Sequence, residues 1–337
     1  MATGRTEDQH GVGRPIATGT VLLILLLKLH GQYGPILLPK GPHLVEATTW
    51  EPNSLISAIE PEPHARICRA LAPGFTPKAL RAQEPYLHQY VNLLVERLRE
   101  RVCTNEWVEL DIAPWLMFTT FDIFGDLGLG ESFDCLRNSR YHPWIVLLFG
   151  SVKAAAYIAA MRFYPWIEYV LIRCIPASLK EKQRRHYEQI ADKVRRRLNY
   201  EVERPDIMSH VVIKAADPEE GMPIDEINVT FMVLTTAGSE TTATVLSGIM
   251  NYFIQQPEKL AVVAGEIRQF QSESHITLDA LRGLTYLNAV INEGLRLCTP
   301  IPWMLPRRVP RGGGTVCGVW LPGGTPVSIQ AYAMNRD

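Results

Sequence analysis

The sequence predicts a mainly α-helical protein with a small β portion near its C-terminal end. Hydrophobic residues recur at three- and four-residue spacing, which is typical of helices with a buried face. Proline and glycine separate many of these stretches, as expected for connections between helices. The clearest predicted helices are residues 84–100, 114–129, 180–198, 224–250, 257–270 and 286–297.

The β portion is predicted as one hairpin. Two strand-like stretches, residues 315–321 and 325–329, flank the turn sequence Pro-Gly-Gly at 322–324. Runs of this kind on either side of a turn signal are typical of paired strands. Cys317 is then expected to be a structural strand residue rather than a metal ligand.

Bulk composition indicates an ordinary folded protein. Of the 337 residues, 47% are hydrophobic and 20% charged, and the net charge of −1 gives no sign of a nucleic-acid partner. The basic run at 193–197 is predicted to be a solvated helix face. No CxxC pair is present, so we expect neither a disulfide framework nor a zinc site from the six scattered cysteines, Cys68, Cys103, Cys135, Cys174, Cys298 and Cys317.

An N-terminal segment, residues 1–32, precedes the predicted domain, residues 33–337. It holds an apolar run from Val21 to Leu27, which is shorter than the roughly 20 residues that span a bilayer. No small-residue cleavage site follows it. A buried first element and the remnant of a membrane anchor both remain open.

The most unusual stretch is Thr-Thr-Ala-Gly-Ser-Glu-Thr-Thr-Ala-Thr at residues 235–244, inside the predicted helix 224–250. A glycine costs about 1 kcal/mol relative to alanine in a helix interior. Threonine and serine side chains compete for backbone hydrogen bonds or bend the helix. A local rule broken inside a core helix is expected at a functional site.

Two interpretations of this stretch stay open. In the functional one, Gly238 lets a flat or diatomic ligand approach the backbone, and Glu240 and Thr241 relay protons in an apolar pocket. In the structural one, the threonine hydroxyls satisfy preceding carbonyls and the glycine permits close helix packing.

A second motif is Glu-Gly-Leu-Arg at residues 293–296. Positions three apart share a helix face, so Glu293 and Arg296 can pair. The surrounding leucine and valine pattern predicts a largely buried helix, in which a charged pair should belong to a larger network.

Together, and in this order, these motifs resemble the cytochrome P-450 family of haem-thiolate monooxygenases. The resemblance extends to motifs further upstream, which are similar to those of the fungal, secondary-metabolism branch of the family. It rests on AGSETT at 237–242, EGLR at 293–296, PR at 306–307, PRGG at 310–313, AYAMNRD at 331–337, HAR at 64–66, LAPGF at 71–75, DIAPW at 111–115 and TTFDIFGDL at 119–127.

The resemblance implies roles for individual residues. Thr241 would hydrogen-bond dioxygen at the haem, and Glu240 would help deliver protons. Ala237 and Gly238 would lie against the haem face, and Arg307 would contact a haem propionate. Glu293 and Arg296 would form a structural core pair.

One expected propionate ligand departs from the family pattern. The position four residues after His64 is Cys68, where the family usually has arginine or histidine. Arg69 or His64 would take the place of the missing basic residue, whereas Cys68 itself is predicted to be a small buried apolar residue.

The implied activity inserts one oxygen atom from O2 into a lipophilic secondary metabolite. Its cofactors would be haem and NADPH, the latter through an NADPH-cytochrome reductase partner at the endoplasmic reticulum membrane. The family's ligand cysteine lies in an FxxGxRxCxG loop beyond the hairpin, and the sequence stops at Asp337. We therefore expect a C-terminally incomplete fold without oxygenase activity by itself. The alternative is a non-catalytic relic, a helical lipophile- or partner-binding protein without haem.

Overall fold

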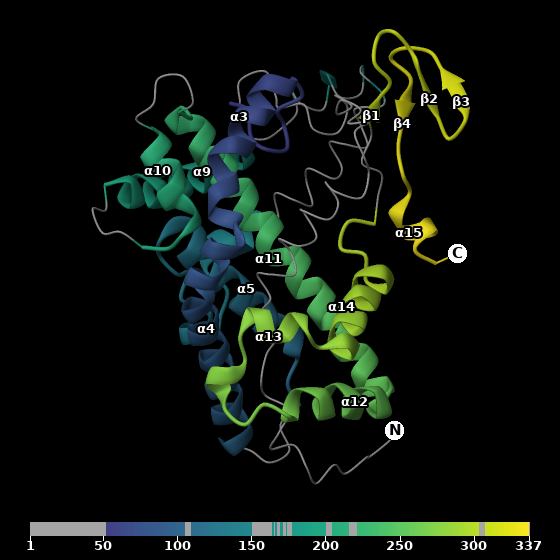
Figure 1. The fold of residues 1–337 in the computed structure, drawn as a ribbon. Coiled ribbons are helices and arrows are strands. Elements are labelled where there is room, and N and C mark those ends of the chain that lie inside the picture. Colours follow the sequence, from purple (N-terminus) through teal and green to yellow (C-terminus); the bar gives the residue numbers. More distant parts are fainter. Residues whose placement is uncertain are drawn as a thin grey trace.

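The fold is mostly helical, as predicted (Figure 1). The computed structural model describes residues 52–104, 109–149, 177–199, 204–215, 221–302 and 307–336, with single positions between 164 and 173. The N-terminal segment, with the run from Val21 to Leu27, lies outside the described residues. The helices are α3 (Pro61–Leu71), η2 (Ala72–Phe75), α4 (Pro77–Thr104), α5 (Ile112–Leu129), α6 (Cys135–Asn138), α9 (Ala177–Leu198), α10 (Ile207–Ala215), α11 (Ile224–Gln255), α12 (Pro257–Arg268), η3 (Glu273–His275), α13 (Leu278–Arg282), α14 (Thr285–Leu297) and α15 (Ala331–Met334).

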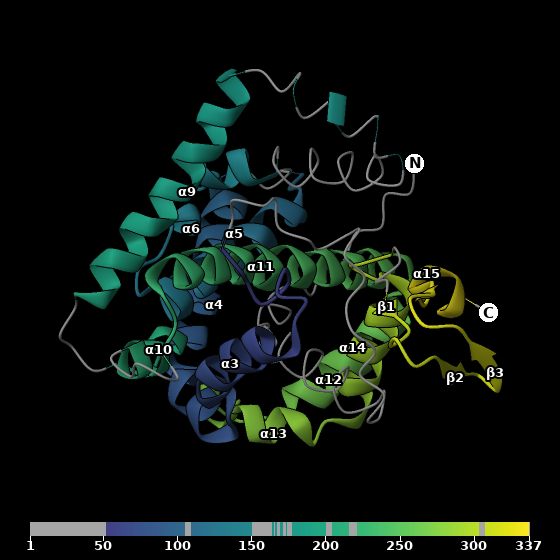
Figure 2. The same ribbon diagram turned by 90° about the horizontal axis from the view of Figure 1, so that it is seen from above.

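Helix α11 is the centre of the molecule. It has 32 residues and is therefore about 48 Å long. In Figures 1 and 2 it crosses the molecule, with α5 along much of its length and α9 and α14 against its two ends. The helix predicted at 224–250 is confirmed, and it continues without interruption through the threonine-rich stretch.

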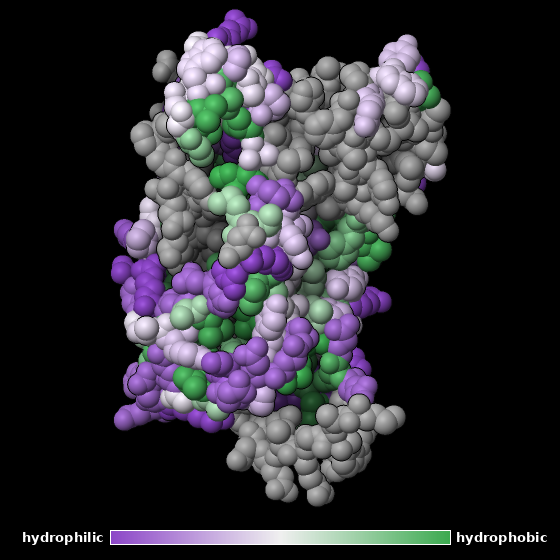
Figure 3. Space-filling view, turned by 90° about the vertical axis from the view of Figure 1, so that its right-hand side faces the viewer, coloured by the Kyte–Doolittle hydropathy of each residue, from purple (hydrophilic) through white to green (hydrophobic). Residues whose placement is uncertain are grey.

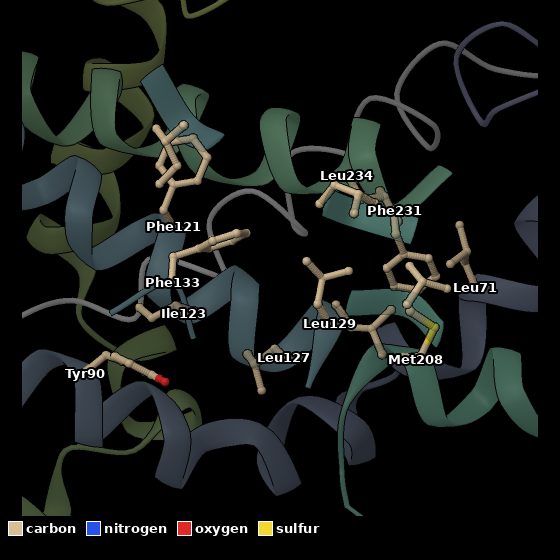
Figure 4. Close-up of a cluster of buried hydrophobic side chains, with 14 of the residues drawn as sticks. Leu71, Tyr90, Phe121, Ile123, Leu127, Leu129, Phe133, Met208, Phe231 and Leu234 are labelled. Carbon is tan, nitrogen blue, oxygen red and sulfur yellow. The ribbon is translucent and has the colours of Figure 1, made fainter. Parts of the chain in front are cut away.

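The hydrophobic core lies between α11 and its neighbours. Figure 4 shows Phe231 of α11 beside Leu71 of α3, Met208 of α10 and Leu129 of α5. Phe231 and Met208 are fully buried. A second, smaller cluster joins α11, α12 and α14 through Val245, Ile249, Phe253, Val263, Leu284 and Leu287. The core thus fixes α3, α5, α10 and α14 around one central helix.

The remaining predicted helices are confirmed, with small differences at their ends. They correspond to α4, α5, α9, α12 and α14. Helix α4 is longer than the predicted range 84–100: it begins at Pro77 and ends at Thr104. The short helices α6, α10, α13 and α15 were not among those predicted, because four to nine residues are too few for a clear helical period.

The predicted hairpin is wrong. The hairpin pairs residues 314–316 with residues 319–321, and it turns at Cys317 and Gly318. Both of its strands therefore lie almost entirely within the first predicted strand, residues 315–321. The two turn residues have positive φ angles of 50° and 80°, as a two-residue hairpin turn requires. Cysteine at the first turn position gives no sequence signal for such a turn. The second predicted strand pairs instead with residues 307–308, which precede the hairpin. The strands are β1 (Arg307–Arg308), paired with β4 (Pro326–Val327), and β2 (Gly314–Val316), paired with β3 (Val319–Leu321).

The prediction that residues 193–197 form a solvated face is wrong for part of that run. Arg195 and Arg196 are exposed in ion pairs. Arg197 is buried, and its Nε lies 2.9 Å from Oδ2 of Asp206, with side-chain exposures of 4% and 0%. One arginine of the run is therefore buried in an ion pair with Asp206, nine residues further along the chain.

Candidate functional site

The threonine hydroxyls of α11 bond to their own helix. Each of the five threonines between residues 235 and 244 donates to the carbonyl four residues earlier, at 2.6 to 3.0 Å. These bonds are those that the structural interpretation expects. They explain how a glycine- and threonine-rich stretch remains helical, because each hydroxyl is satisfied without leaving the helix.

Ser239 behaves differently from the threonines. Its hydroxyl donates to the backbone carbonyl of Thr120 on α5, at 3.3 Å, and the side chain is fully buried. This contact joins α11 to α5, the helix that packs along much of its length. Ser239 therefore belongs to the packing of the core rather than to a reactive surface.

Glu240 and Thr241 form the titratable part of the motif. Glu240 is half-buried, and burial raises the pKa of its carboxyl above the ordinary value. Thr241 Oγ1 donates to the carbonyl of Ala237 at 2.6 Å, which leaves the oxygen lone pairs able to accept a hydrogen bond. A carboxyl with a raised pKa, next in the sequence to a hydroxyl, can hold and pass protons.

Helix α3 carries the predicted basic residues. His64 and Cys68 lie one turn apart, with Cys68 Sγ 3.8 Å from His64 Nε2, and both are partly buried. Arg69 is exposed, and its Nη2 lies 3.0 Å from Glu62 Oε1. Of the two predicted substitutes, His64 is thus the less exposed.

Arg307 lies in β1, where it pairs with Val327 of β4. Its side chain is half-buried, and burial lowers the pKa of its guanidinium. A cation held in a partly desolvated position is suited to an anionic ligand group.

The Glu293–Arg296 pair is formed, but the expectation of a largely buried helix is wrong for this face. Arg296 Nη2 and Nε donate to both carboxylate oxygens of Glu293 at 2.6 and 2.7 Å. The two side chains are 44% and 53% exposed. The pair lowers the pKa of Glu293 and raises that of Arg296. Only one side of α14 faces α11 and α12, through Leu287 and Gly294.

The face of the molecule that carries α12, α14 and the β2–β3 hairpin is mixed in character. Figure 3 shows hydrophobic residues at its surface among hydrophilic ones. Val319 and Trp320 of β3 are 60% and 63% exposed, and Tyr332 of α15 is 50% exposed. Arg296 also donates to the carbonyl of Asn335, which ties α15 to the end of α14.

Two glycines that the sequence analysis did not single out set the approach of α14 to α11. A Cβ on Gly294 would lie 2.4 Å from Ile249 Cγ1, and a Cβ on Gly248 would lie 2.1 Å from Cys298 Sγ. Both distances are far below van der Waals contact. The glycine inside the Glu-Gly-Leu-Arg motif therefore has a packing role, and no periodicity signal could have revealed it.

The described cysteines differ in their surroundings. Burial raises the pKa of Cys135 to about 12 and also raises the pKa of Cys298. Cys103 and Cys317 are exposed. Burial of this kind keeps a thiol protonated, whereas a ligand cysteine must be a thiolate. Among the described residues, no group of three or more His, Cys, Asp and Glu side chains is arranged to hold a metal ion.

Among the helices that the structure describes, none combines the length and the apolar character needed to cross a bilayer.

Comparison with known proteins identifies the family. The family model described as cytochrome P-450 matches residues 42–337. A solved structure of a cytochrome P-450 superimposes with a TM-score of 0.71 at 19% identity, covering 92% of this chain and 70% of that chain. The chain therefore belongs to the cytochrome P-450 family, and the resemblance drawn from the motifs is confirmed.

The similar curated proteins are fungal. The cytochrome P-450 monooxygenase lcsI of Purpureocillium lilacinum is 41% identical, and the match covers 86% of this chain and 55% of lcsI. The monooxygenase cpaH of Aspergillus oryzae is 35% identical, with coverages of 96% and 67%. The trichothecene C-15 hydroxylase of Fusarium sporotrichioides is 39% identical, with coverages of 82% and 56%. The chain thus spans between 55% and 67% of the length of these relatives.

Proposed function

We propose that this chain is the larger part of a haem-dependent monooxygenase that inserts one oxygen atom from O2 into a lipophilic secondary metabolite. The observation that carries the proposal is the half-buried Glu240 carboxyl, whose pKa burial raises, followed on the central helix by the Thr241 hydroxyl. Family membership and the fungal monooxygenase relatives support the same activity.

Residues of α11, α3 and β1 would together bind a flat, anionic cofactor. Ala237 and Gly238 are small, partly exposed residues that would allow a planar group to approach α11. Arg307 and His64 would bind the acidic edge of that group. The exposed Arg69, already paired with Glu62, is a weaker candidate for this role.

The bound haem would supply the activation of dioxygen. The Thr241 hydroxyl would hydrogen-bond the dioxygen, and the Glu240 carboxyl would hold the proton to be delivered. Glu293 and Arg296 would hold the protein scaffold without touching the reacting atoms. NADPH would provide electrons through a reductase partner, and association with the endoplasmic reticulum membrane would bring enzyme and lipophilic substrate together.

A second candidate is a helical lipophile- or partner-binding protein without haem. The surroundings of Cys135 and Cys298 favour it, because burial keeps these thiols protonated. Cys135 and Cys298 are therefore poorly suited to supply a thiolate to the haem.

Reading the messenger RNA beyond the codon for Asp337 separates the two candidates. A continued frame that encodes a glycine-rich FxxGxRxCxG loop is expected for the monooxygenase. A stop codon directly after Asp337 in every transcript would favour the haem-free protein.

A further inference from the structure

We propose that Arg66 and Glu226 are a positioning pair that holds α3 against the start of α11 and is needed for tight haem binding. This inference rests on the proposed function, because α3 carries His64 and α11 carries Gly238. Neither Arg66 nor Glu226 was among the predicted site residues.

The two terminal nitrogens of the Arg66 guanidinium hold two different groups, the Glu226 carboxylate and a backbone carbonyl, and we call this arrangement the fork. Arg66 Nη2 lies 2.8 and 3.0 Å from the two carboxylate oxygens of Glu226. Arg66 Nη1 donates to the backbone carbonyl of Gly221 at 3.0 Å. One guanidinium thus holds both the first turn of α11 and the chain that leads into it, which a lysine could not do.

Burial makes this pair different from the other ion pairs of α3. The side chains of Arg66 and Glu226 are 19% and 11% exposed, whereas those of Arg69 and Glu62 are 49% and 79% exposed. Removing one partner of a largely buried pair leaves a charge without compensation. Glu226 also lies in the first turn of α11, where the helix dipole favours a negative charge.

The pair links two elements that otherwise pack on different neighbours. Helix α3 packs mainly on α10 and η2, whereas α11 packs mainly on α5, α9 and α14. Leu71 at the end of α3 does meet Phe231 in the core, but it lies more than a turn beyond Arg66. The fork therefore fixes the rotation of α3 at the part of the helix that carries His64.

The pair acts at a distance from the cofactor. Glu226 precedes Gly238 by twelve positions on the same helix, which corresponds to about 18 Å along the axis. Neither residue would touch the haem. Their contribution would be to set the position of His64 relative to Gly238.

The test compares Arg66→Gln, Glu226→Gln, the double variant and Arg66→Lys in the 337-residue chain. The control is Arg81→Gln, which breaks an exposed pair between α4 and Asp279. A second control, Leu94→Ala, removes a buried side chain of α4, which is neither helix of the pair. Hydrogen–deuterium exchange of residues 61–71 is measured without haem, and haem affinity is measured by absorbance titration.

We expect Arg66→Gln to speed exchange in α3 and to weaken haem binding by about tenfold, or roughly 1.4 kcal/mol. Arg66→Lys should recover part of both effects, and the double variant should be little worse than either single one. Arg81→Gln should change neither α3 exchange nor haem affinity, and Leu94→Ala should leave haem affinity unchanged. If Arg66→Gln fails to fold, Arg66→Lys and Glu226→Gln provide the same comparison.

The outcomes separate this inference from the proposed function. Haem binding that is unchanged in Arg66→Gln, Glu226→Gln and Arg66→Lys overturns the positioning role, even if α3 exchanges faster. Haem binding that falls equally in Leu94→Ala also overturns it, because general destabilisation then explains the loss. Absence of haem binding by the unaltered chain overturns the proposed haem site itself.

Discussion

The Glu266 carboxylate on α12 caps the start of α14 by accepting a hydrogen bond from the amide of Leu287 at 2.8 Å. The same carboxylate accepts from the amide of Tyr286 at 3.1 Å. Helix α14 has no side-chain cap of its own, since Leu284 occupies its N-cap position. A residue from a neighbouring helix thus satisfies amides that a helix end leaves unpaired.

Glu266→Ala should therefore lower the free energy of unfolding by about 1–2 kcal/mol, as for the loss of a helix cap. Urea unfolding followed by circular dichroism measures the change. Glu96→Ala, at an exposed position on α4, serves as the control and should change stability little. Equal effects of the two substitutions would show that the cap contributes nothing.

Gly294→Ala should destabilise the chain by about 1–3 kcal/mol, the usual range for overpacking a core. The added Cβ would meet Ile249, which lies in the contact between α11 and α14. Gly265→Ala on α12 is the matched control, because nothing lies within 4 Å of its Cβ position. That control should be neutral or stabilising by up to about 1 kcal/mol. A stabilising Gly294→Ala would contradict the close approach of the two helices.

Asp206→Asn should cost about 3–5 kcal/mol, because it leaves the buried Arg197 without its charged partner. Asp192→Asn removes an exposed partner of Arg195 and should cost less than about 1 kcal/mol. Both are measured by chemical denaturation. A similar, small loss in the two variants would show that the Arg197–Asp206 pair is not a core interaction.

Glu240→Gln should change the pH dependence of stability in a defined direction. Burial raises the pKa of Glu240 in the folded chain above its unfolded value. The associated stability is therefore fully present below the ordinary pKa of the carboxyl and is lost as pH rises through the folded pKa. The variant should be more stable than the unaltered chain at neutral pH, and the difference should vanish in acid.

Thermal unfolding of both proteins across this pH range provides the check, with Glu96→Gln as an exposed control. A difference that is constant with pH, or that grows towards acid, would show that burial does not raise the pKa of Glu240.

Helical periodicity in the sequence was sufficient to predict α5, α9, α11, α12 and α14, because each has a long stripe of apolar residues. It failed where periodicity does not determine the partner of a side chain or the conformation of a turn. The same run of basic residues contains the exposed Arg196 and the buried Arg197, and only the packing of Asp206 distinguishes them. Likewise, Cys317 gives no local sign of its left-handed turn.

The candidate site shows the same division. The motif on α11 could be found from the sequence because its composition conflicts with its helical pattern. The exposure of Glu293 and Arg296 could not, because the leucine pattern of α14 describes one face of the helix and says nothing of the other. Arg66 and Glu226 are 160 positions apart, so no local pattern connects them.

The central claim is that α11, α3 and β1 form a haem site, and an absorbance titration of haem into the 337-residue chain tests it most directly. We expect saturable binding of one haem per chain, which Gly238→Val and Arg307→Gln weaken and Arg81→Gln leaves unchanged. Binding that does not saturate, or that Gly238→Val and Arg307→Gln leave intact, would contradict it.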